Sequence, residues 1–441
     1  MNPSSSRTAA PKDWLWLLSC FFIVGLGVVV AIKQAPFYIP DEGAHYLRTY
    51  EVGHLHLLNL RGSVGTDMPC NDYAVVAGKY HPVAWANVKT EAEQNDRNCV
   101  VNTRNTAGAY SFVPYIPAAF AMRIAEHMGG TVEQRLIASR ATGFLVWITL
   151  IFVALRGICD GRTLMGCVVL VPSFFWQLVG VSADGAILAS SLVYVLIVLK
   201  ALQGAPLLTR GMLVQLLLTA ALMGASKGVY APLCLFSWAL WGHLPARGVV
   251  YKIALLSLPT LVCLGVFAFF MGLADPSLVF LGNGANPALQ MEHVVNHPWQ
   301  FVETVYRSLC ETMNVGFIAP SYAVPNGDRG YGITVLTLVS SGSLMVFTSF
   351  GVSKTARCIA ALIALVLCLA VCLPLYLTYN PVAWPVMLGL QSRYFLPIIP
   401  LVFMAVSFDA TKIDWGSLRK YAMWAPLLPV IGLYLACINI S

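Results

Sequence analysis

The chain has 441 residues, of which 58% are hydrophobic and only 11% are charged, and its mean hydropathy is +0.72. Average chains carry about 25% charged residues, so this composition excludes an ordinary soluble protein. The net charge of +7 comes from short basic clusters between long apolar runs, a pattern that sets membrane orientation and requires no nucleic-acid partner. The apolar runs are continuous rather than alternating, which excludes a transmembrane barrel. We therefore expect an all-α polytopic membrane protein that forms a single domain over residues 1–441.

The first apolar run, residues 14–32, follows a short segment that contains Arg7 and Lys12. A secretory signal has an apolar region of only about 7–15 residues and a small-residue cleavage site, so this run predicts an uncleaved first span with a cytoplasmic N-terminus. If the basic clusters are cytoplasmic, about eleven spans follow, with the C-terminus outside. They are expected near residues 14–32, 137–155, 163–181, 185–201, 211–226, 228–243, 253–272, 331–350, 358–378, 395–409 and 421–438.

Two long outside loops separate these spans, at residues 33–136 and 273–330. Within the first loop, residues 110–130 are apolar but contain Pro114, Pro117 and Arg123, which predicts an interfacial helix rather than a span. In the second loop, Pro298 predicts the first position of a helix capped by Asn296 or His297.

Two cysteines, Cys70 and Cys99, lie in the first outside loop. In an oxidising compartment they are the favoured disulfide pair. Cys310 lies in the second outside loop, so another pairing stays open.

Polar residues follow the first span in the segment YIPDEGAHYLR, residues 38–48. Asp41, His45 and Arg48 are spaced to share one helical face. Asp41 and Glu42 are adjacent carboxylates at a membrane boundary, where desolvation and repulsion are expected to raise the pKa. Such carboxylates are candidate general bases. The alternative is structural, because Pro40 and first-turn acids also suit a helix start.

Three further charges are expected at the same outer face. Asp184 lies in a short connection beside Ser182, where either residue could instead cap a helix. Lys227 and Arg393 lie at outer ends of spans, against the positive-inside bias. Each could snorkel or cap carbonyl groups, but together they suggest a phosphate clamp. One carboxylate would then deprotonate an acceptor hydroxyl while the cations stabilise the departing phosphate.

Six motifs carry a family resemblance along nearly the whole chain. They are PDEGAHYLR, VPYIPAAFAMRI with RLIASRATG, VPSFFWQLVGVSADG, SKGVYAPL, HPWQF and LQSRYFLP. In this order they resemble a bacterial membrane family of unknown function, DUF2142, which is similar to the GT-C class of glycosyltransferases. The resemblance implies a long first periplasmic loop with interfacial helices, a polyprenyl-phosphate sugar donor, Asp41 as catalytic base and Asp184 as a second acid. The common GT-C metal pattern, two acids separated by one residue, is not matched, so a divalent metal cofactor is left open.

The resulting hypothesis is a hexosyltransferase of the bacterial inner membrane with a periplasmic active site, and the resemblance implies that it inverts the anomeric centre. It would transfer sugar to a cell-envelope glycan such as the O-antigen of lipopolysaccharide, as large enzymes of three-component glucosylation systems do. Its partners would include the bilayer, a donor-synthesising enzyme and a flippase. The expected catalytic residues are Asp41, Glu42 and Asp184, and the expected substrate-binding residues are His45, Arg48, Lys227, Tyr230, Gln391, Arg393 and Tyr394. A glycolipid transporter or flippase and a non-catalytic envelope-assembly subunit are the alternatives; transport usually places ionisable groups near the bilayer midplane.

Overall fold

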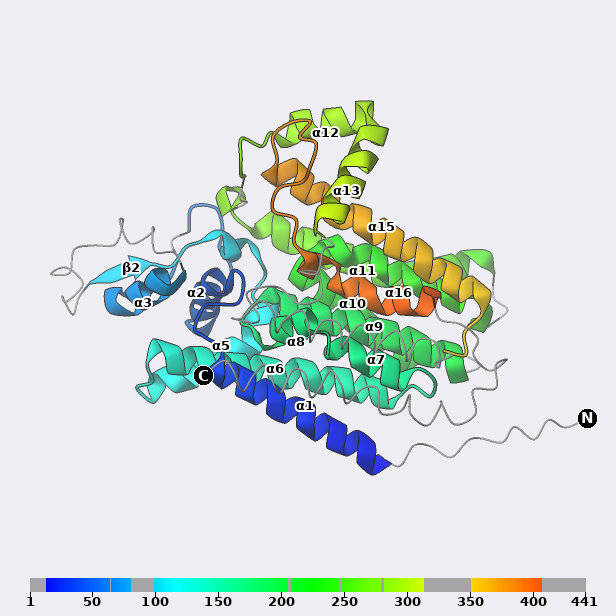
Figure 1. Cartoon of the computed structure of the whole chain (residues 1–441), viewed down its shortest axis with the longest axis horizontal. Helices are drawn as coiled ribbons and strands as arrows, with labels where there is room; N and C mark the ends of the chain where they lie inside the picture. The colour runs from blue at the N-terminus through cyan, green and yellow to red at the C-terminus, as the bar shows by residue number, and fades with distance from the viewer. Residues whose placement is uncertain are drawn as a thin grey trace, which may run out of the picture.

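The computed structural model describes residues 13–63, 65–80, 99–204, 208–245, 248–278, 281–312 and 350–406. Long helices lie side by side along the longest axis, and α2, α3 and a small sheet lie at one end (Figure 1). The bundle consists of α1 (Asp13–Lys33), α6 (Val132–Arg156), α7 (Arg162–Val169), α8 (Pro172–Val179), α9 (Ala183–Gly204), α10 (Arg210–Lys227), the 3₁₀ helix η4 (Gly228–His243), α11 (Val249–Leu273), α15 (Lys354–Tyr379), the 3₁₀ helix η7 (Ser392–Ile398) and α16 (Ile399–Val406).

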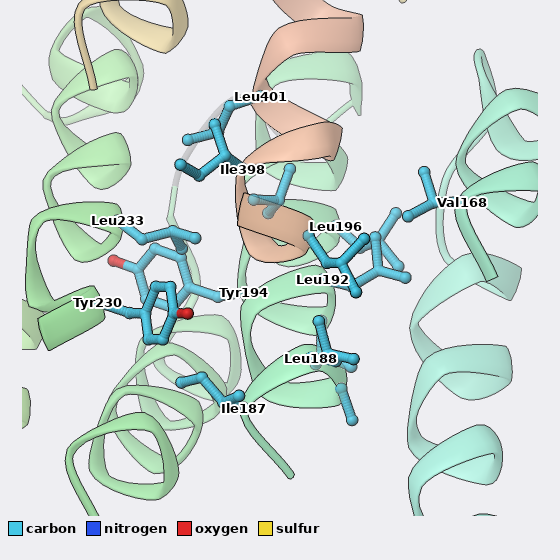
Figure 2. Close-up of a cluster of buried hydrophobic side chains, with 14 of the residues drawn as sticks. Val168, Ile187, Leu188, Leu192, Tyr194, Leu196, Tyr230, Leu233, Ile398 and Leu401 are labelled. Atoms are coloured by element: carbon cyan, nitrogen blue, oxygen red, sulfur yellow. The ribbon is translucent and has the colours of Figure 1, made fainter. Parts of the chain in front are cut away.

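The centre of the bundle is α9, which packs against α6, α8, α10 and η4. Its side chains are buried on all faces, as expected for a helix that is apolar around its whole circumference. Figure 2 shows Leu188, Leu192 and Leu196 of this helix in a cluster with Leu233 of η4 and Leu401 of α16. This packing fixes the position of the helix whose first turn carries Asp184.

Five helical segments in the described part of the chain are long and apolar enough to cross a membrane, or six if the bent pair α7–α8 forms one span. The segments are Val132–Arg156, Ala183–Gly204, Arg210–His243, Val249–Leu273 and Lys354–Tyr379. The protein is therefore a helical membrane protein, and its described residues hold five or six candidate spans, fewer than the eleven expected for the whole chain.

The lower number has several sources. The expected spans 211–226 and 228–243 coincide with α10 and η4, which are counted together as Arg210–His243 although the backbone at Lys227 between them is extended, and the expected span 163–181 is two short helices bent by 63°. At the expected span 14–32, the apolar helix α1 (Asp13–Lys33) is 21 residues long and covers that range, and the helix at the expected span 395–409 is described only as far as Val406. The expected spans 331–350 and 421–438 lie outside the described residues, except for Phe350.

Several turns that carry basic residues, called the basic turns below, lie at the end of the bundle opposite α2. Gln203, near the end of α9, donates hydrogen bonds to the carbonyls of Asp160 (2.7 Å) and Phe350 (3.0 Å). Gly157 lies against the side chain of Lys200. These contacts bring together the segments 156–162, 200–203 and 350–357, which carry five of the basic residues used to assign orientation: Arg156, Arg162, Lys200, Lys354 and Arg357.

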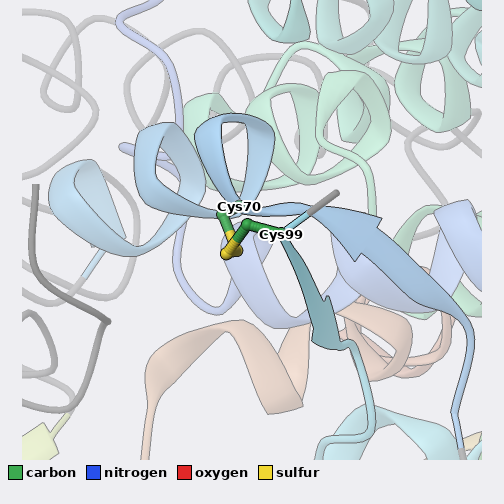
Figure 3. Close-up of a disulfide and its surroundings, with 2 residues drawn as sticks. All are labelled: Cys70 and Cys99. Carbon is green, nitrogen blue, oxygen red and sulfur yellow. A yellow bond between two sulfur atoms is a disulfide. The ribbon is translucent and has the colours of Figure 1, made fainter. Parts of the chain in front are cut away.

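Between α1 and α6 the chain forms a compact layer at the α2 end. Its elements are α2 (Glu42–Gly53), β1 (Asp67–Pro69), α3 (Cys70–Tyr80), β2 (Val100–Asn102), the 3₁₀ helices η2 (Thr106–Ala109) and η3 (Val113–Tyr115), and α5 (Ile116–His127). The strands β1 and β2 pair antiparallel. The Cys70–Cys99 disulfide joins the start of α3 to the residue before β2 (Figure 3), and Cys310 is a free thiol. The predicted pairing is confirmed.

Residues 110–130 do not form a candidate span. Their main helix, α5, is 12 residues long and packs against α2 and α6. A row of large apolar side chains four residues apart is exposed along it: Ile116, Phe120, Ile124 and Met128. This face suits the expected interfacial location, which stays a prediction.

The second long loop contains η5 (Pro276–Leu278), α12 (Pro287–Asn296) and α13 (Pro298–Thr312). Pro298 is the first residue of α13, as predicted, and the carbonyl of His297 accepts hydrogen bonds from Gln300 and Phe301. Phe301 contacts Tyr376 of α15 with ring centroids 5.5 Å apart.

Candidate active site

Four charged side chains from four separate segments meet at the α2 end of the bundle. Arg393 donates to the carboxylate of Asp41, and Lys227 donates to the carboxylate of Asp184. A second nitrogen of Arg393, Nη1, lies 3.7 Å from Oδ2 of Asp184. The two carboxylates and two cations thus form one cluster, and the two acids meet across Arg393.

Local backbone structure explains how these side chains reach one place. Asp41 precedes α2 with a left-handed backbone (φ 61°) and, although it is the N-cap residue, makes no side-chain capping bond. Its carboxylate is therefore directed to Arg393 instead of to the helix end. Ser182 performs the capping function at α9, since its Oγ accepts from the amide of Asp184 (3.1 Å). At Lys227 the chain is extended between α10 and η4 (φ −151°).

The two carboxylates of the cluster differ in exposure. The side chain of Asp184 is 9% exposed and that of Arg393 is 3% exposed, whereas that of Asp41 is 50% exposed. A buried charge is stable only with partners, and Asp184 has Lys227 and Arg393. Asp41 is the acid that a ligand can reach.

The ionisation of Asp41 is governed by two opposing effects. Burial raises the pKa of its carboxyl group, and the charge and hydrogen bond of Arg393 together lower it by more, so that the pKa lies below its usual value. This reverses the expectation of a raised pKa at the membrane boundary, because that expectation contained no partner for the carboxylate.

Aromatic rings surround the two cations. The Nζ of Lys227 lies 5.8 Å from the ring centroid of Tyr110 and 5.5 Å from that of Tyr394, and the guanidinium carbon of Arg393 lies 5.3 Å from the Tyr394 ring. These are cation–π distances. The hydroxyl of Tyr230 donates to the carbonyl of Tyr394 (2.8 Å) and fixes that backbone. Tyr110 was not among the predicted residues; it is brought here because neighbouring Ser111 donates to the carbonyl of Ala225, near the end of α10 (2.8 Å).

His45 is buried one turn after Asp41. Its Nδ1 lies 2.7 Å from the hydroxyl of Tyr115, a residue that sequence reasoning missed. Burial lowers the pKa of His45 to about 4, and the opposing charges around it do not restore the usual value. His45 is therefore a neutral hydrogen-bonding group at pH 7.

Glu42 is placed away from the cluster. It is fully buried and accepts two hydrogen bonds from Arg140 of α6, at 2.8 and 2.5 Å. Arg140 also donates to the carbonyls of Gln34 (2.7 Å) and Ala35 (3.0 Å). The pair anchors the end of α1 and the start of α2 to α6, so we assign Glu42 a structural role and correct its expected catalytic one.

Arg48 is likewise occupied by the protein itself. It pairs with Glu51 (2.9 Å) and donates to the carbonyls of His56, Leu57 and Tyr110. Asp41 does not share the expected helical face with His45 and Arg48, because its left-handed backbone turns its side chain away, although its carbonyl still accepts from the amide of His45 (3.1 Å). The predicted substrate contact of Arg48 is corrected to a structural one.

Gln391 precedes η7, and its carbonyl accepts from the amide of Tyr394 (3.1 Å).

A metal site is not formed by the side chains present: within the described ranges, no three His, Cys, Asp or Glu residues gather as a set of metal ligands. Asp41 and Asp184 each face a fixed cation instead. These residues do not fit a divalent metal.

Comparison with known proteins gives one match. The family model described as "Predicted membrane protein (DUF2142)" matches residues 21–402. No curated protein and no solved structure matches the chain. The matched region contains all four charged residues of the cluster, and because it spans most of the sequence, the chain belongs to the DUF2142 family of predicted membrane proteins.

Proposed function

We propose that this protein is a membrane glycosyltransferase that moves a sugar from a polyprenyl-phosphate donor to a hydroxyl group of a cell-envelope glycan. The observation that supports the proposal most is the meeting of Asp41, Asp184, Lys227 and Arg393 at one end of the bundle. The half-exposed carboxylate can take a proton, and the two cations can bind phosphate oxygens.

In the proposed reaction, Asp41 accepts the proton of the acceptor hydroxyl as its oxygen attacks the anomeric carbon of the donor. The bond between that carbon and the phosphate oxygen breaks, and the polyprenyl phosphate leaves with one more negative charge. Lys227 and Arg393 stabilise this charge in a partly dehydrated site, where fixed cations act more strongly than in water. Attack from the face opposite the phosphate inverts the anomeric centre. Asp184 keeps both cations in place.

The position of the cluster favours transfer over transport. Asp184 lies in the first turn of α9, Lys227 ends α10, and Arg393 lies at the start of η7. All three are at helix ends rather than at helix centres, whereas transporters usually place ionisable groups near the bilayer midplane. We further propose a location in a bacterial inner membrane, with the cluster on the periplasmic side and an O-antigen-like glycan as acceptor.

The test is transfer by purified protein in detergent, supplied with radiolabelled polyprenyl-phosphate hexoses and envelope glycan. We expect release of polyprenyl phosphate and a labelled glycan. Detergent has no separate compartments, so a flippase or an assembly subunit would yield no product. If no labelled glycan forms with any of the polyprenyl-phosphate hexoses that are made in the cell membranes containing the protein, the proposed function is contradicted.

A further inference from the structure

Asp41, the more exposed carboxylate of the cluster, is paired with Arg393, the cation whose planar group suits a phosphate best. Arg393 is almost fully buried and donates from Nη2 to Asp41 and from Nη1 to the carbonyl of Pro40 (3.1 Å). Its third donor, Nε, is buried without a hydrogen-bond partner in the described structure. A guanidinium presents its donors in a fixed fork that matches two oxygens of a phosphate group. Asp41 fills only part of that fork.

We propose that the donor's phosphate group takes the place of the Asp41 carboxylate on Arg393, so that donor binding itself releases Asp41 to act as the base. This inference rests on the proposed function and adds the order of events at the site. An incoming phosphate gains two donors, Nη2 and the unpartnered Nε. Asp41 moves from Arg393 toward the acceptor hydroxyl.

Charge balance supports the exchange. With Asp41 in place, the two carboxylates neutralise the two cations. When Asp41 leaves, Lys227, Arg393 and Asp184 together carry one positive charge, which equals the single negative charge of a sugar phosphodiester. Asp184 does not leave, because it is buried and held by Lys227 as well as by Arg393.

The backbone around Asp41 also suits a side chain that moves. Asp41 is not committed to the end of α2, since it makes no capping bond, and half of its side chain is exposed. Exposed ion pairs are weak compared with buried ones. Losing Arg393 as its partner removes the main cause of the lowered pKa of Asp41, so the released carboxylate is a stronger base than the bound one.

The test measures binding of sugar-free polyprenyl phosphate to detergent-solubilised full-length protein. Asp41→Asn removes the competing charge, and Asn tolerates the left-handed backbone. Asp41→Gly removes the side chain and accepts a positive φ without strain. We expect both variants to bind about two- to fivefold more tightly than the wild type, the strength expected of one exposed ion pair. Asp72→Asn is the matched control, because Asp72 pairs with Arg135 (2.7 Å) outside the cluster; its binding should equal that of the wild type. A parallel titration with inorganic phosphate separates recognition of the anion alone from recognition of the lipid.

Equal or weaker binding by both Asp41 variants, in a wild-type protein that transfers sugar, would overturn the exchange and leave the proposed function intact. Tighter binding by both variants, in a wild-type protein that transfers no sugar, would support the exchange while the proposed function fails. Absence of polyprenyl-phosphate binding by the wild type and both variants would contradict the exchange together with the phosphate site.

Discussion

At the residue scale, Asp41 and Glu42 are neighbours in the chain, yet their carboxylates have opposite environments. Asp41 is half exposed and contacts Arg393, whereas Glu42 is fully buried and binds Arg140 through two hydrogen bonds. The left-handed backbone of Asp41, just before the helical backbone of Glu42, turns the two side chains in different directions. The second carboxylate holds α2 in position, and we propose that the first one reacts.

The buried pair predicts a stability effect. Glu42→Gln leaves the guanidinium of Arg140 buried without a counter-charge, and such a change typically costs about 3–5 kcal/mol. We expect a clear drop in the thermal unfolding temperature of the detergent-solubilised protein. Asp41→Asn, at the next position, should leave that temperature nearly unchanged. Equal unfolding temperatures for Glu42→Gln and the wild type would contradict the anchoring role.

The planar guanidinium of Arg393 is expected to strengthen polyprenyl-phosphate binding more than a simple positive charge would. Arg393→Lys keeps the charge but loses the fork, and one lost charge-assisted hydrogen bond corresponds to about 10- to 100-fold weaker binding. We expect that loss for polyprenyl phosphate in the same detergent, by titration. Arg307→Lys, in an exposed pair with Glu303 on α13, is the control and should bind as the wild type does. Unchanged binding by Arg393→Lys would remove Arg393 from the phosphate site.

The sequence predicted the charged members of the cluster better than the aromatic ones. Asp41, Asp184, Lys227 and Arg393 are conspicuous because charges at the ends of apolar runs are costly. Tyr110 and Tyr115 are ordinary residues in an apolar loop, and only tertiary packing brings them to Lys227 and His45. The partner of Glu42 could not be inferred either, because Arg140 is 98 positions away.

At the element scale, the layer formed by α2, α3, α5 and the two strands positions Asp41 above the bundle. The pattern of Pro and Arg within residues 110–130 predicted that this segment would not be a span, and α5 is indeed a short separate helix. The positive-inside bias cannot show where a helix bends, which is why residues 163–181 form two short helices instead of one straight span.

The disulfide predicts a stabilisation of this layer. Cys70 and Cys99 are 29 positions apart, and a cross-link closing a loop of this length contributes about 3–4 kcal/mol in the chain-entropy model. Mass spectrometry of non-reduced peptides should recover the two cysteines as one cross-linked species. Reduction should lower the unfolding temperature of the wild type and should not affect a Cys70→Ser/Cys99→Ser variant. Recovery of both thiols free in protein from an oxidising compartment would contradict the pairing.

At the scale of the whole molecule, the charged cluster and the basic turns lie at opposite ends of the bundle. Asp184 begins α9, and Gln203, near the end of the same helix, contacts the basic turns. From the positive-inside bias we predict that the basic end faces the cytoplasm and that the cluster lies on the other side.

This arrangement predicts opposite accessibility for two exposed thiols. Cys159 lies beside the basic turns, and Cys310 lies on α13, next to the chain segment that follows α15. In variants that keep the disulfide and one of these cysteines, an impermeant maleimide applied to spheroplasts should label Cys310 readily. Cys159 should react only after the membrane is opened. The reverse pattern would contradict the orientation.

We propose that Asp41 is the base of a sugar transfer, and a comparison of wild type with Asp41→Asn in the purified transfer assay tests this role. General base catalysis typically contributes about 10²- to 10⁴-fold. We predict a loss of that size in the rate of labelled-glycan formation, with unchanged unfolding temperature and undiminished binding of polyprenyl phosphate. Wild-type turnover by Asp41→Asn would contradict the proposed role of Asp41 as the base.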